Sequence, residues 1–448
     1  MNPVVVSVLF LTALCLLKFN IIIAIILSAV LAGLIAGMPM GNVIVEDVLE
    51  RVGIMPTFIE GMASQTQVAL SYVLLGALAY GISGSGLTTK FAASLTRVFG
   101  KIGKWFVLLL LAAIACLSQN VIPIHIAFIP ILIPPLLAMM NRMKIDRRGA
   151  ACALTFGLKA PYMLIPAGFG AIFHDIVATN MTKNGVEIAE GAIWPAAILP
   201  TLGMVGGLFF AIFVTFRKDR VYEDRPLVGV KEVDAKSTEG FTLKHAGALI
   251  GALTAFIVQI IFGDSWALPL GAALGIVIMI AFGTIRYKDF DAALKGGIGL
   301  MGFIAFIMLA AGGFGAVIRA TGGVSSLVQW AMTMAGGNKL GAVLVMQFVG
   351  LLITMGIGTS FGTVPIIAVI FVPIMSAMGF SPMAIAALII SAGVTGDAGT
   401  PASDSTLGPT AGLNADGQHD HIYETCVPTF IHYNFPIMIM GTIAAMIL

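Results

Sequence analysis

The chain has 448 residues, of which 58% are hydrophobic and 10% are charged, and its mean hydropathy is +1.01. Soluble domains carry about 25% charged residues, so this composition excludes a soluble globular protein and predicts a polytopic membrane protein. The formal net charge of +2 provides no basic surface for a nucleic acid, and we expect no such partner. The four cysteines lack C-x-x-C and zinc-ligand spacing, so we expect neither structural disulfides nor a transition-metal site.

Apolar runs separated by short polar loops make up the first half of the chain. Residues 4–17 and 21–38 come first and are joined by Lys18-Phe19-Asn20. No basic segment precedes the first run and no clear small-residue cleavage site follows it, so we expect a retained helical hairpin rather than a signal peptide. An acidic stretch at 39–67 is expected to be a loop. The later apolar runs of this half are 68–82, 105–117, 121–140, 149–173 and 192–216.

The pattern restarts after a hydrophilic stretch at 217–244, which we interpret as a cytoplasmic linker. The halves on either side, 1–216 and 245–448, carry their polar breaks in the same order, with Pro166 corresponding to Pro401. Loops rich in Lys and Arg in the first half match loops poor in them in the second, so the positive-inside rule places matching loops on opposite sides. We therefore predict an all-α polytopic membrane protein of two inverted repeats, each of about seven hydrophobic segments, with re-entrant hairpins and discontinuous helices.

The most informative stretch is Gly396-Asp397-Ala398-Gly399-Thr400-Pro401-Ala402-Ser403-Asp404-Ser405-Thr406, directly after an apolar run. Its glycines and proline disfavour one continuous helix. A charged side chain at membrane depth costs roughly 2.5–3.5 kcal/mol on insertion scales, and irregular backbone there is tolerated where it is buried in protein or lines a cavity. The alternative is that the carboxylates bond loop backbone at a membrane surface. We expect a cation site, with Na⁺ as the coupling ion, formed by Asp397, Thr400, Ser403, Asp404 and Thr406.

A second polar break lies at Gly358-Thr359-Ser360-Phe361-Gly362-Thr363, before Pro365. Its hydroxyls favour a hairpin tip that faces the cation site, although Gly358-x-x-x-Gly362 alone would also suit close helix packing. Ser118-Gln119-Asn120 is the corresponding stretch of the first half. We expect these two tips to contact a substrate through Ser118, Gln119, Asn120, Thr359, Ser360 and Thr363.

Two further polar residues lie within apolar runs. Lys159 could replace one Na⁺ as a fixed cation, pair with Asp397, contact a substrate carboxylate, or reach back to the basic loop about ten residues away. His125 is a candidate substrate contact or proton carrier, although a hydrogen-bonded structural histidine is the simpler interpretation. His419 and His421 lie in a polar loop without metal-ligand spacing, and we interpret them as solvated or pH-sensing.

At the two polar breaks the sequence resembles the NhaC-like branch of the sodium/proton antiporter family. That branch has a Gly-Asp-x-x-Ser-Pro-x-Ser-Asp-Thr-Thr run, which residues 396–406 match with Thr400 and Ser405 as the two exchanges. Residues 358–363 resemble its Gly-Thr-Ser-Trp-Gly-Thr run. The length, the N-terminal hairpin and Ser118-Gln119-Asn120 are more similar to the YuiF-type members, which are regarded as amino acid transporters. The resemblance implies an ion-transporter fold with inverted repeats, and Lys159 does not belong to the antiporter pattern.

We expect a secondary active transporter of the bacterial inner membrane that is coupled to Na⁺ or H⁺ and imports an amino acid, with histidine as one candidate, by alternating access. The alternative is a Na⁺/H⁺ antiporter without an organic substrate. A channel is disfavoured because no filter repeat or charge ring is visible. An enzyme is disfavoured because no nucleophile–base pair or phosphate-binding loop is visible. The expected partners are a small-molecule or ion substrate, the lipid bilayer and a second copy of the chain in a homodimer.

Overall fold

The protein is helical throughout most of the chain that the computed structural model describes. The described residues are 2–17, 19–45, 48–63, 65–87, 103–120, 129–167, 169–226, 241–262, 266–323, 326, 333 and 338–448. His125, together with the rest of 121–128, lies outside them, as does half of the expected linker, 227–240.

The first half begins with the expected helical hairpin, formed by α1 (Pro3–Leu16) and α2 (Ile21–Ile35). The acidic stretch after it contains a small antiparallel β-hairpin of β1 (Val43–Val45) and β2 (Val48–Arg51). The remaining elements are α3 (Ile54–Ala63), α4 (Thr66–Gly84), α6 (Lys104–Asn120), α7 (Ile129–Arg142), α8 (Arg147–Leu164), α9 (Phe169–Lys183), the 3₁₀ turn η2 (Glu190–Ala192), α10 (Ile193–Phe210) and its π-helical end η3 (Ala211–Thr215).

The second half also consists of helices, several of which are interrupted. Its elements are α11 (Leu243–Phe262), α12 (Ala267–Ala281), the 3₁₀ turn η4 (Tyr287–Asp289), α13 (Phe290–Ala320), α15 (Lys339–Ile357), α16 (Ser360–Ala377), α17 (Pro382–Val394), α18 (Asp404–Leu413), the π-helical η5 (His421–Cys426), α19 (Val427–Thr429), the π-helical η6 (Phe430–Asn434) and α20 (Phe435–Ile447).

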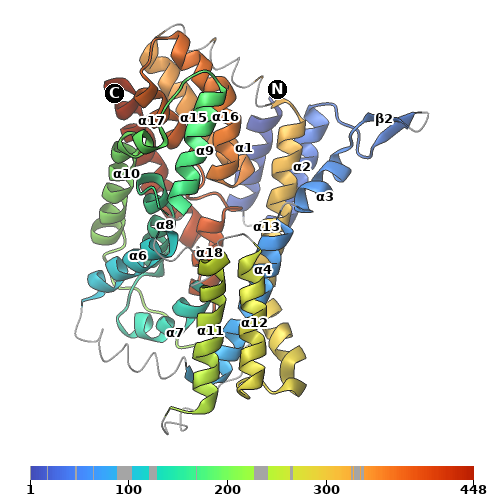
Figure 1. Cartoon of the computed structure of the whole chain (residues 1–448), viewed down its shortest axis with the longest axis vertical. Coiled ribbons are helices and arrows are strands. Elements are labelled where there is room, and N and C mark those ends of the chain that lie inside the picture. The colour runs from blue at the N-terminus through green and yellow to red at the C-terminus, as the bar shows by residue number, and fades with distance from the viewer. Residues whose placement is uncertain are drawn as a thin grey trace.

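The long helix α13 connects two packed groups of helices. With 31 residues it is about 46 Å long, and it packs against α2 and α3 as well as against α4. Helices α4, α11 and α12 lie together at the lower end of the molecule, while α8, α9, α10 and α15–α17 form the upper group (Figure 1). Small residues allow close contacts in the lower group: a Cβ on Gly76 would lie 2.5 Å from the Gly297 carbonyl oxygen.

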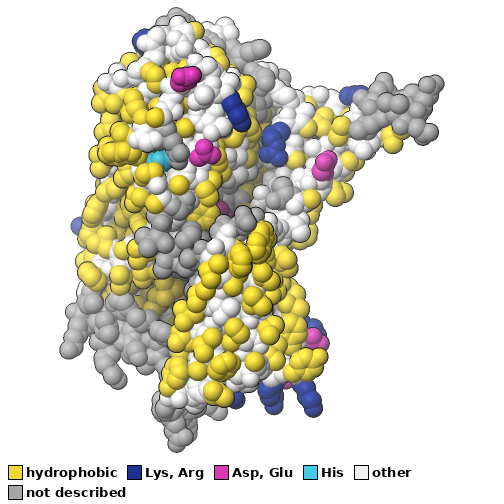
Figure 2. Space-filling model, viewed as in Figure 1, with side chains coloured by type: hydrophobic (Ala, Val, Ile, Leu, Met, Phe, Trp, Pro, Cys, Tyr) yellow, Lys and Arg dark blue, Asp and Glu magenta, His cyan; other side chains and the backbone are white. Residues whose placement is uncertain are grey.

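The outer surface of these helices is apolar, as expected for a protein surrounded by lipid. Hydrophobic side chains cover the visible face of α11 and α12, while Lys and Arg gather at the lower end (Figure 2). Ile257 on α11 and Val277 on α12 are 50% and 59% exposed. Five helices of the described residues are long and apolar enough to cross a membrane, and the bent pair α8–α9 would make six. The inverted repeats and their boundaries remain predictions.

Helix α17 is buried on every side, which makes it the centre of the upper group. Every residue from Ala384 to Val394 is buried. A helix that is hydrophobic all round fits only inside a helical bundle, and α17 packs against α10, α15, α16 and α20. The polar stretch that follows α17 therefore begins deep inside the protein.

A buried ion pair joins the start of α8 to the end of α18. Arg147 makes two hydrogen bonds of 2.6 Å to the Asp416 carboxylate and one of 2.9 Å to the Leu413 carbonyl oxygen. Arg147 belongs to a stretch rich in Lys and Arg, and its side chain is nevertheless fully buried. A bidentate guanidinium–carboxylate pair of this kind fixes geometry as well as charge.

We predict that Asp416→Asn destabilises the protein, because it leaves the Arg147 guanidinium buried without its counter-charge. The expected loss is about 3–5 kcal/mol, measured as a lower Tm in detergent. Glu223→Gln is the control, since the Glu223–Arg225 pair is exposed and should contribute little. Equal Tm values for the two variants would contradict the prediction.

Candidate functional site

Two interrupted helices bring their broken ends together inside the upper group. Helix α15 ends at Ile357, its C-cap Gly358 adopts φ +80°, and α16 begins at Ser360. Helix α17 ends at Val394, and α18 begins at Asp404 with Ser403 as its N-cap. The discontinuous helices expected at these two stretches are therefore present.

Two glycines make the loop between α17 and α18 feasible. Gly396 and Gly399 have φ values of +96° and +110°, a region that residues with a Cβ rarely adopt. There is also no room for a side chain, since a Cβ on Gly399 would lie 2.5 Å from the Cβ of Phe430. The loop is thus held against its neighbours by backbone alone at these positions.

Asp397 is fully buried at the junction of the broken helices. Its Oδ2 accepts hydrogen bonds from the Ser360 backbone N–H, at 3.0 Å, and from the Ser360 hydroxyl, while Oδ1 accepts one from the Ser403 hydroxyl. Because Ser360 is the first residue of α16, the carboxylate lies at a helix N-terminus, where a negative charge is favourable.

Lys159 of α8 forms an ion pair with Asp397 and is itself only 2% exposed. Its Nζ also lies 3.9 Å from Asp404 Oδ1. Of the roles considered for Lys159, pairing with Asp397 is the one observed, and the interpretation that it reaches back to the basic loop is wrong. One ammonium thus faces two carboxylates, and the three groups together carry a formal charge of −1. Of the two carboxylates, that of Asp397 is buried and that of Asp404 is 27% exposed.

The other predicted cation ligands bond to the backbone. The Thr400 hydroxyl donates to the Met355 carbonyl oxygen at 3.2 Å, and the Thr406 hydroxyl donates to the Thr400 carbonyl oxygen at 2.7 Å. Both bonds fix the loop between α17 and α18. The structure therefore gathers Asp397, Ser403 and Asp404 around Lys159, and a Na⁺ site formed by the predicted ligands remains a prediction.

The predicted substrate contacts lie in different surroundings. Ser360 bonds directly to Asp397, and the Thr363 hydroxyl donates to the Thr359 carbonyl oxygen one turn earlier, at 2.9 Å. Ser118, near the end of α6, donates to the Ala115 carbonyl oxygen at 2.7 Å, and Gln119 is fully buried beside it. Asn120 is the last residue of α6. His125 lies outside the described residues, so a role for it stays a prediction.

Sequence reasoning missed three residues that support the site. The Tyr162 hydroxyl donates to Ser360 Oγ at 2.9 Å, and the Thr155 hydroxyl donates to the Ser405 carbonyl oxygen at the same distance. Asn434 accepts from the Gly396 N–H at 3.0 Å and donates to the Ala398 carbonyl oxygen at 2.7 Å. Asn434 could have been singled out from the sequence, because an amide side chain within an apolar terminal run needs a buried hydrogen-bond partner.

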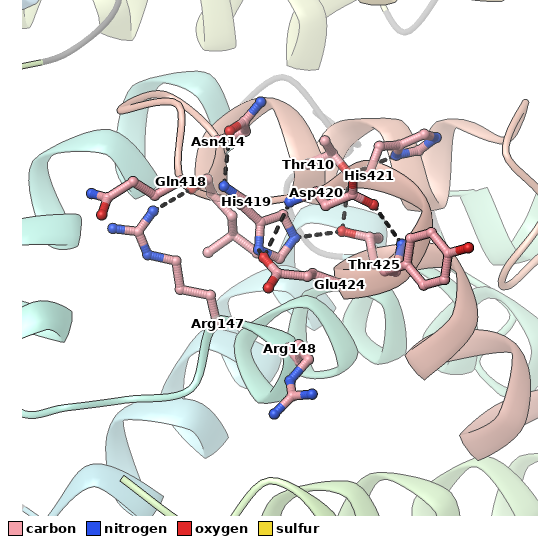
Figure 3. Close-up of polar contacts among 12 residues, drawn as sticks. Arg147, Arg148, Thr410, Asn414, Gln418, His419, Asp420, His421, Glu424 and Thr425 are labelled. Carbon is pink, nitrogen blue, oxygen red and sulfur yellow. Dashed lines mark hydrogen bonds and ion pairs between the residues drawn. The ribbon is translucent and has the colours of Figure 1, made fainter. Parts of the chain in front are cut away.

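The interpretation of His419 as a solvated residue is wrong. His419 is 3% exposed and lies between Glu424 and Thr425, near Arg147 (Figure 3). Its Nδ1 is 3.4 Å from Glu424 Oε2, and its Nε2 is 2.7 Å from Thr425 Oγ1. Burial, and then the positive charge of Arg147, hold the pKa of His419 well below its usual range.

Comparison with known proteins identifies the family. Residues 153–444 match the model described as "Na+/H+ antiporter family", and residues 2–99 match one described as "Na+-H+ antiporter family". The chain is 47% identical to a membrane protein of Vibrio parahaemolyticus, with 100% of both chains covered, and 42% identical to one of Haemophilus influenzae, with 100% of this chain and 99% of the other covered. It is 41% identical to the Bacillus subtilis protein named "Putative amino acid transporter YuiF", again over 100% of both chains.

Similarity to solved structures is weaker. The Neisseria gonorrhoeae protein MtrF, described as illuminating a class of antimetabolite efflux pumps, aligns with a TM-score of 0.40 and 15% identity, over 100% of this chain and 96% of that chain. The sequence matches are what establish kinship, because one family model covers more than half of the chain and the relatives align over their full length. The resemblance seen at the two polar breaks is thereby confirmed. This membrane protein belongs to the Na⁺/H⁺ antiporter family.

Proposed function

We propose that the protein is a secondary transporter of the bacterial inner membrane that imports an amino acid, coupled to Na⁺ or H⁺, by alternating access. The observation that carries the proposal is the Lys159–Asp397 ion pair, buried where the two interrupted helices meet. Transporter binding sites are typically built from discontinuous helices near the middle of the membrane. The relative named as an amino acid transporter supports the substrate class.

An α-amino acid fits this ion pair because it carries one charge of each sign. Its carboxylate can replace Asp397 as the partner of Lys159, and its ammonium group can replace Lys159 as the partner of Asp397. One buried pair is then exchanged for two, and no charge is left without a counter-ion. An uncharged substrate would break the pair without replacing it, which costs several kcal/mol.

A coupling cation fits the same arrangement. Lys159, Asp397 and Asp404 carry a formal charge of −1, so one Na⁺ or one proton neutralises the group. The ammonium of Lys159 lies 3.9 Å from Asp404 Oδ1, and the Ser403 hydroxyl lies within hydrogen-bond distance of both carboxylates. When a cation binds to the carboxylates it weakens their hold on Lys159, so that the substrate carboxylate can bind there. Cation and amino acid would thus bind cooperatively.

Access to the site requires a conformational change. Lys159 is 2% exposed and Asp397 is fully buried, so neither a cation nor an amino acid reaches them in the arrangement observed. This change would have to break bonds that hold the loop between α17 and α18, such as that from the Thr400 hydroxyl to the Met355 carbonyl oxygen and those of Asn434 to Gly396 and Ala398. Movement of helices α17 and α18 against α15 and α16 would expose the Lys159–Asp397 ion pair to one side of the membrane at a time.

We predict that Asp397→Asn abolishes coupled uptake, because the neutral amide holds neither a cation nor the substrate ammonium. Uptake of labelled amino acids, with histidine first in the panel, is measured in proteoliposomes under an imposed Na⁺ or pH gradient. Thr363→Ser is the control, since it keeps the hydroxyl that bonds to Thr359. Undiminished uptake by Asp397→Asn would refute the assignment.

We predict that Lys159→Gln raises KM for the amino acid by about ten- to hundredfold, because a charge-assisted hydrogen bond to the carboxylate is lost. The variant leaves Asp397 buried without its partner, so it is compared with the double variant Lys159→Gln/Asp397→Asn, which removes both charges. The double variant is expected to fold, shown by a single Tm, and to transport nothing. Normal KM values in a folded Lys159→Gln protein would contradict the substrate contact.

A second candidate, a Na⁺/H⁺ antiporter without an organic substrate, is favoured by the family match. Here Na⁺ and protons would compete for Asp397 and Asp404. We predict for the amino acid transporter that Na⁺ alone leaves a preset pH gradient intact in proteoliposomes, monitored with a pH-sensitive dye. Dissipation of the gradient by Na⁺ without amino acid would identify the antiporter instead.

A further inference from the structure

Four polar side chains form a continuous hydrogen-bonded chain beside the site (Figure 3). It starts at His419, whose Nε2 lies 2.7 Å from Thr425 Oγ1, and continues from there to Thr410 Oγ1 at 2.9 Å. Thr410 Oγ1 is 2.8 Å from His421 Nδ1, and His421 Nε2 is 2.9 Å from the Pro401 carbonyl oxygen. The chain thus connects the loop after α18 with the loop between α17 and α18.

The members of this chain are largely shielded from solvent. His419 is 3% exposed, Thr410 is 7% exposed and Thr425 is fully buried, while His421 is half-buried. Each of the four can both donate and accept a proton. A buried row of such groups can pass a proton along without bulk water.

The donor and acceptor capacities of these groups limit where the protons can lie. The Pro401 carbonyl oxygen only accepts, so His421 Nε2 carries a proton. In the arrangement in which Thr410 donates its single proton to Thr425, its bond to His421 needs a second proton on Nδ1. In this arrangement His421 is positively charged. Thr425 then donates to His419 Nε2, and the neutral His419 carries its proton on Nδ1, which lies 3.4 Å from Glu424 Oε2 without forming a hydrogen bond to it.

Reversing the two hydroxyls gives a second, equally complete arrangement. Thr425 then donates to Thr410, and Thr410 donates to His421 Nδ1, which leaves His421 neutral. His419 now carries a proton on each ring nitrogen, with Nε2 donating to Thr425 and Nδ1 facing Glu424. The two arrangements differ only in which end of the chain holds the proton. The Thr406 carbonyl oxygen lies 2.9 Å from Thr410 Oγ1 and is a further acceptor toward which the Thr410 hydroxyl can rotate.

The charges around the two imidazoles differ. At His419, Glu424 attracts a proton, but burial and the nearby arginines hold the pKa of this histidine well below its usual range. Glu424 is itself paired with Arg220, and Asp420 lies beside His421. The titratable and charged groups that face the chain are Arg147, Arg148, Arg220, Asp416, Asp420, Glu424 and Cys426.

We propose that His419, Thr425, Thr410 and His421 form a proton relay between Glu424 and the Pro401 edge of the loop that carries Asp397. In one passage, the O–H bond of a protonated Glu424 breaks and an N–H bond forms at His419 Nδ1. The Nε2 proton of His419 moves to Thr425, the Thr425 proton to Thr410, and the Thr410 proton to His421 Nδ1. Each oxygen gains one proton and loses one, so only the two ends change.

The relay rests on the proposed function, in which it carries a coupling proton from Glu424 to His421. The proton leaves from the half-buried His421 ring itself, since the Pro401 carbonyl oxygen only accepts a hydrogen bond. A proton on His421 strengthens the Nε2–H bond to the Pro401 carbonyl oxygen. Pro401 lies in the same loop as Asp397, Thr400 and Ser403, so the charge state of His421 would act on the position of that loop. The relay thus links the protonation of Glu424 with the arrangement of the site.

The first test observes the imidazoles directly and needs no transport. The full-length protein is labelled with ¹⁵N-histidine in liposomes, and the protonation of each ring nitrogen is followed against pH by solid-state NMR. His419→Gln and His421→Gln assign the two signals. In the wild type both rings are expected to change their protonated nitrogen at one shared midpoint. In Thr425→Val, which removes the hydroxyl but keeps the side-chain shape, the two rings should titrate separately, whereas Thr425→Ser should behave as the wild type.

The second test measures proton flux into proteoliposomes with a pH-sensitive dye under an imposed gradient. Thr425→Val is expected to slow the flux about tenfold or more, and Thr425→Ser to retain it. The thermal midpoints of both variants establish folding, and Thr410→Val replaces Thr425→Val if the latter does not fold. Shared titration without proton flux in the wild type would leave the relay standing and refute proton coupling. Independent titration in the wild type, or unchanged behaviour of Thr425→Val in both tests, would overturn the relay.

Discussion

The buried ion pair between Lys159 and Asp397 is the interaction on which the rest of the site depends. Removing two charges from water costs several kcal/mol per ion, and this cost is met only where geometry and further hydrogen bonds are good. Here Ser360 and Ser403 supply those bonds, and the first turn of α16 supplies a favourable field. The interruptions of α15–α16 and α17–α18 are therefore what make a charged pair tolerable inside a bundle as apolar as that around α17.

The sequence was sufficient to predict the local features of this arrangement. Glycine, proline and hydroxyl residues at 358–363 and 396–406 predicted the helix breaks, and the isolated carboxylates predicted a buried polar centre. The pairing itself could not be predicted with certainty, because Lys159 and Asp397 are separated by 238 positions and periodicity carries no information on which helices become neighbours. For the same reason the bond from Tyr162 to Ser360 emerged only from the fold, as did the identity of the partners of Asn434.

For the loop after α18 the prediction from sequence was wrong, because polar residues were interpreted as exposed to solvent. His419, Asp416 and Glu424 lie in a hydrophilic stretch, yet they are buried because Arg147 and Arg220 from distant parts of the chain neutralise the acids. A polar loop can be buried when its charges find partners, and a single sequence does not reveal those partners. The same partners hold His419 in place at the start of the hydrogen-bonded chain that ends at Pro401.

In the proposed mechanism the substrate replaces each member of the Lys159–Asp397 ion pair as the partner of the other. A structure of the protein in lipid with the transported amino acid bound, determined by electron cryomicroscopy, tests this claim most directly. The account predicts that Lys159 and Asp397 are separated, with the substrate carboxylate on Lys159 and its ammonium group on Asp397. A bound substrate elsewhere, with the Lys159–Asp397 contact intact, would contradict it.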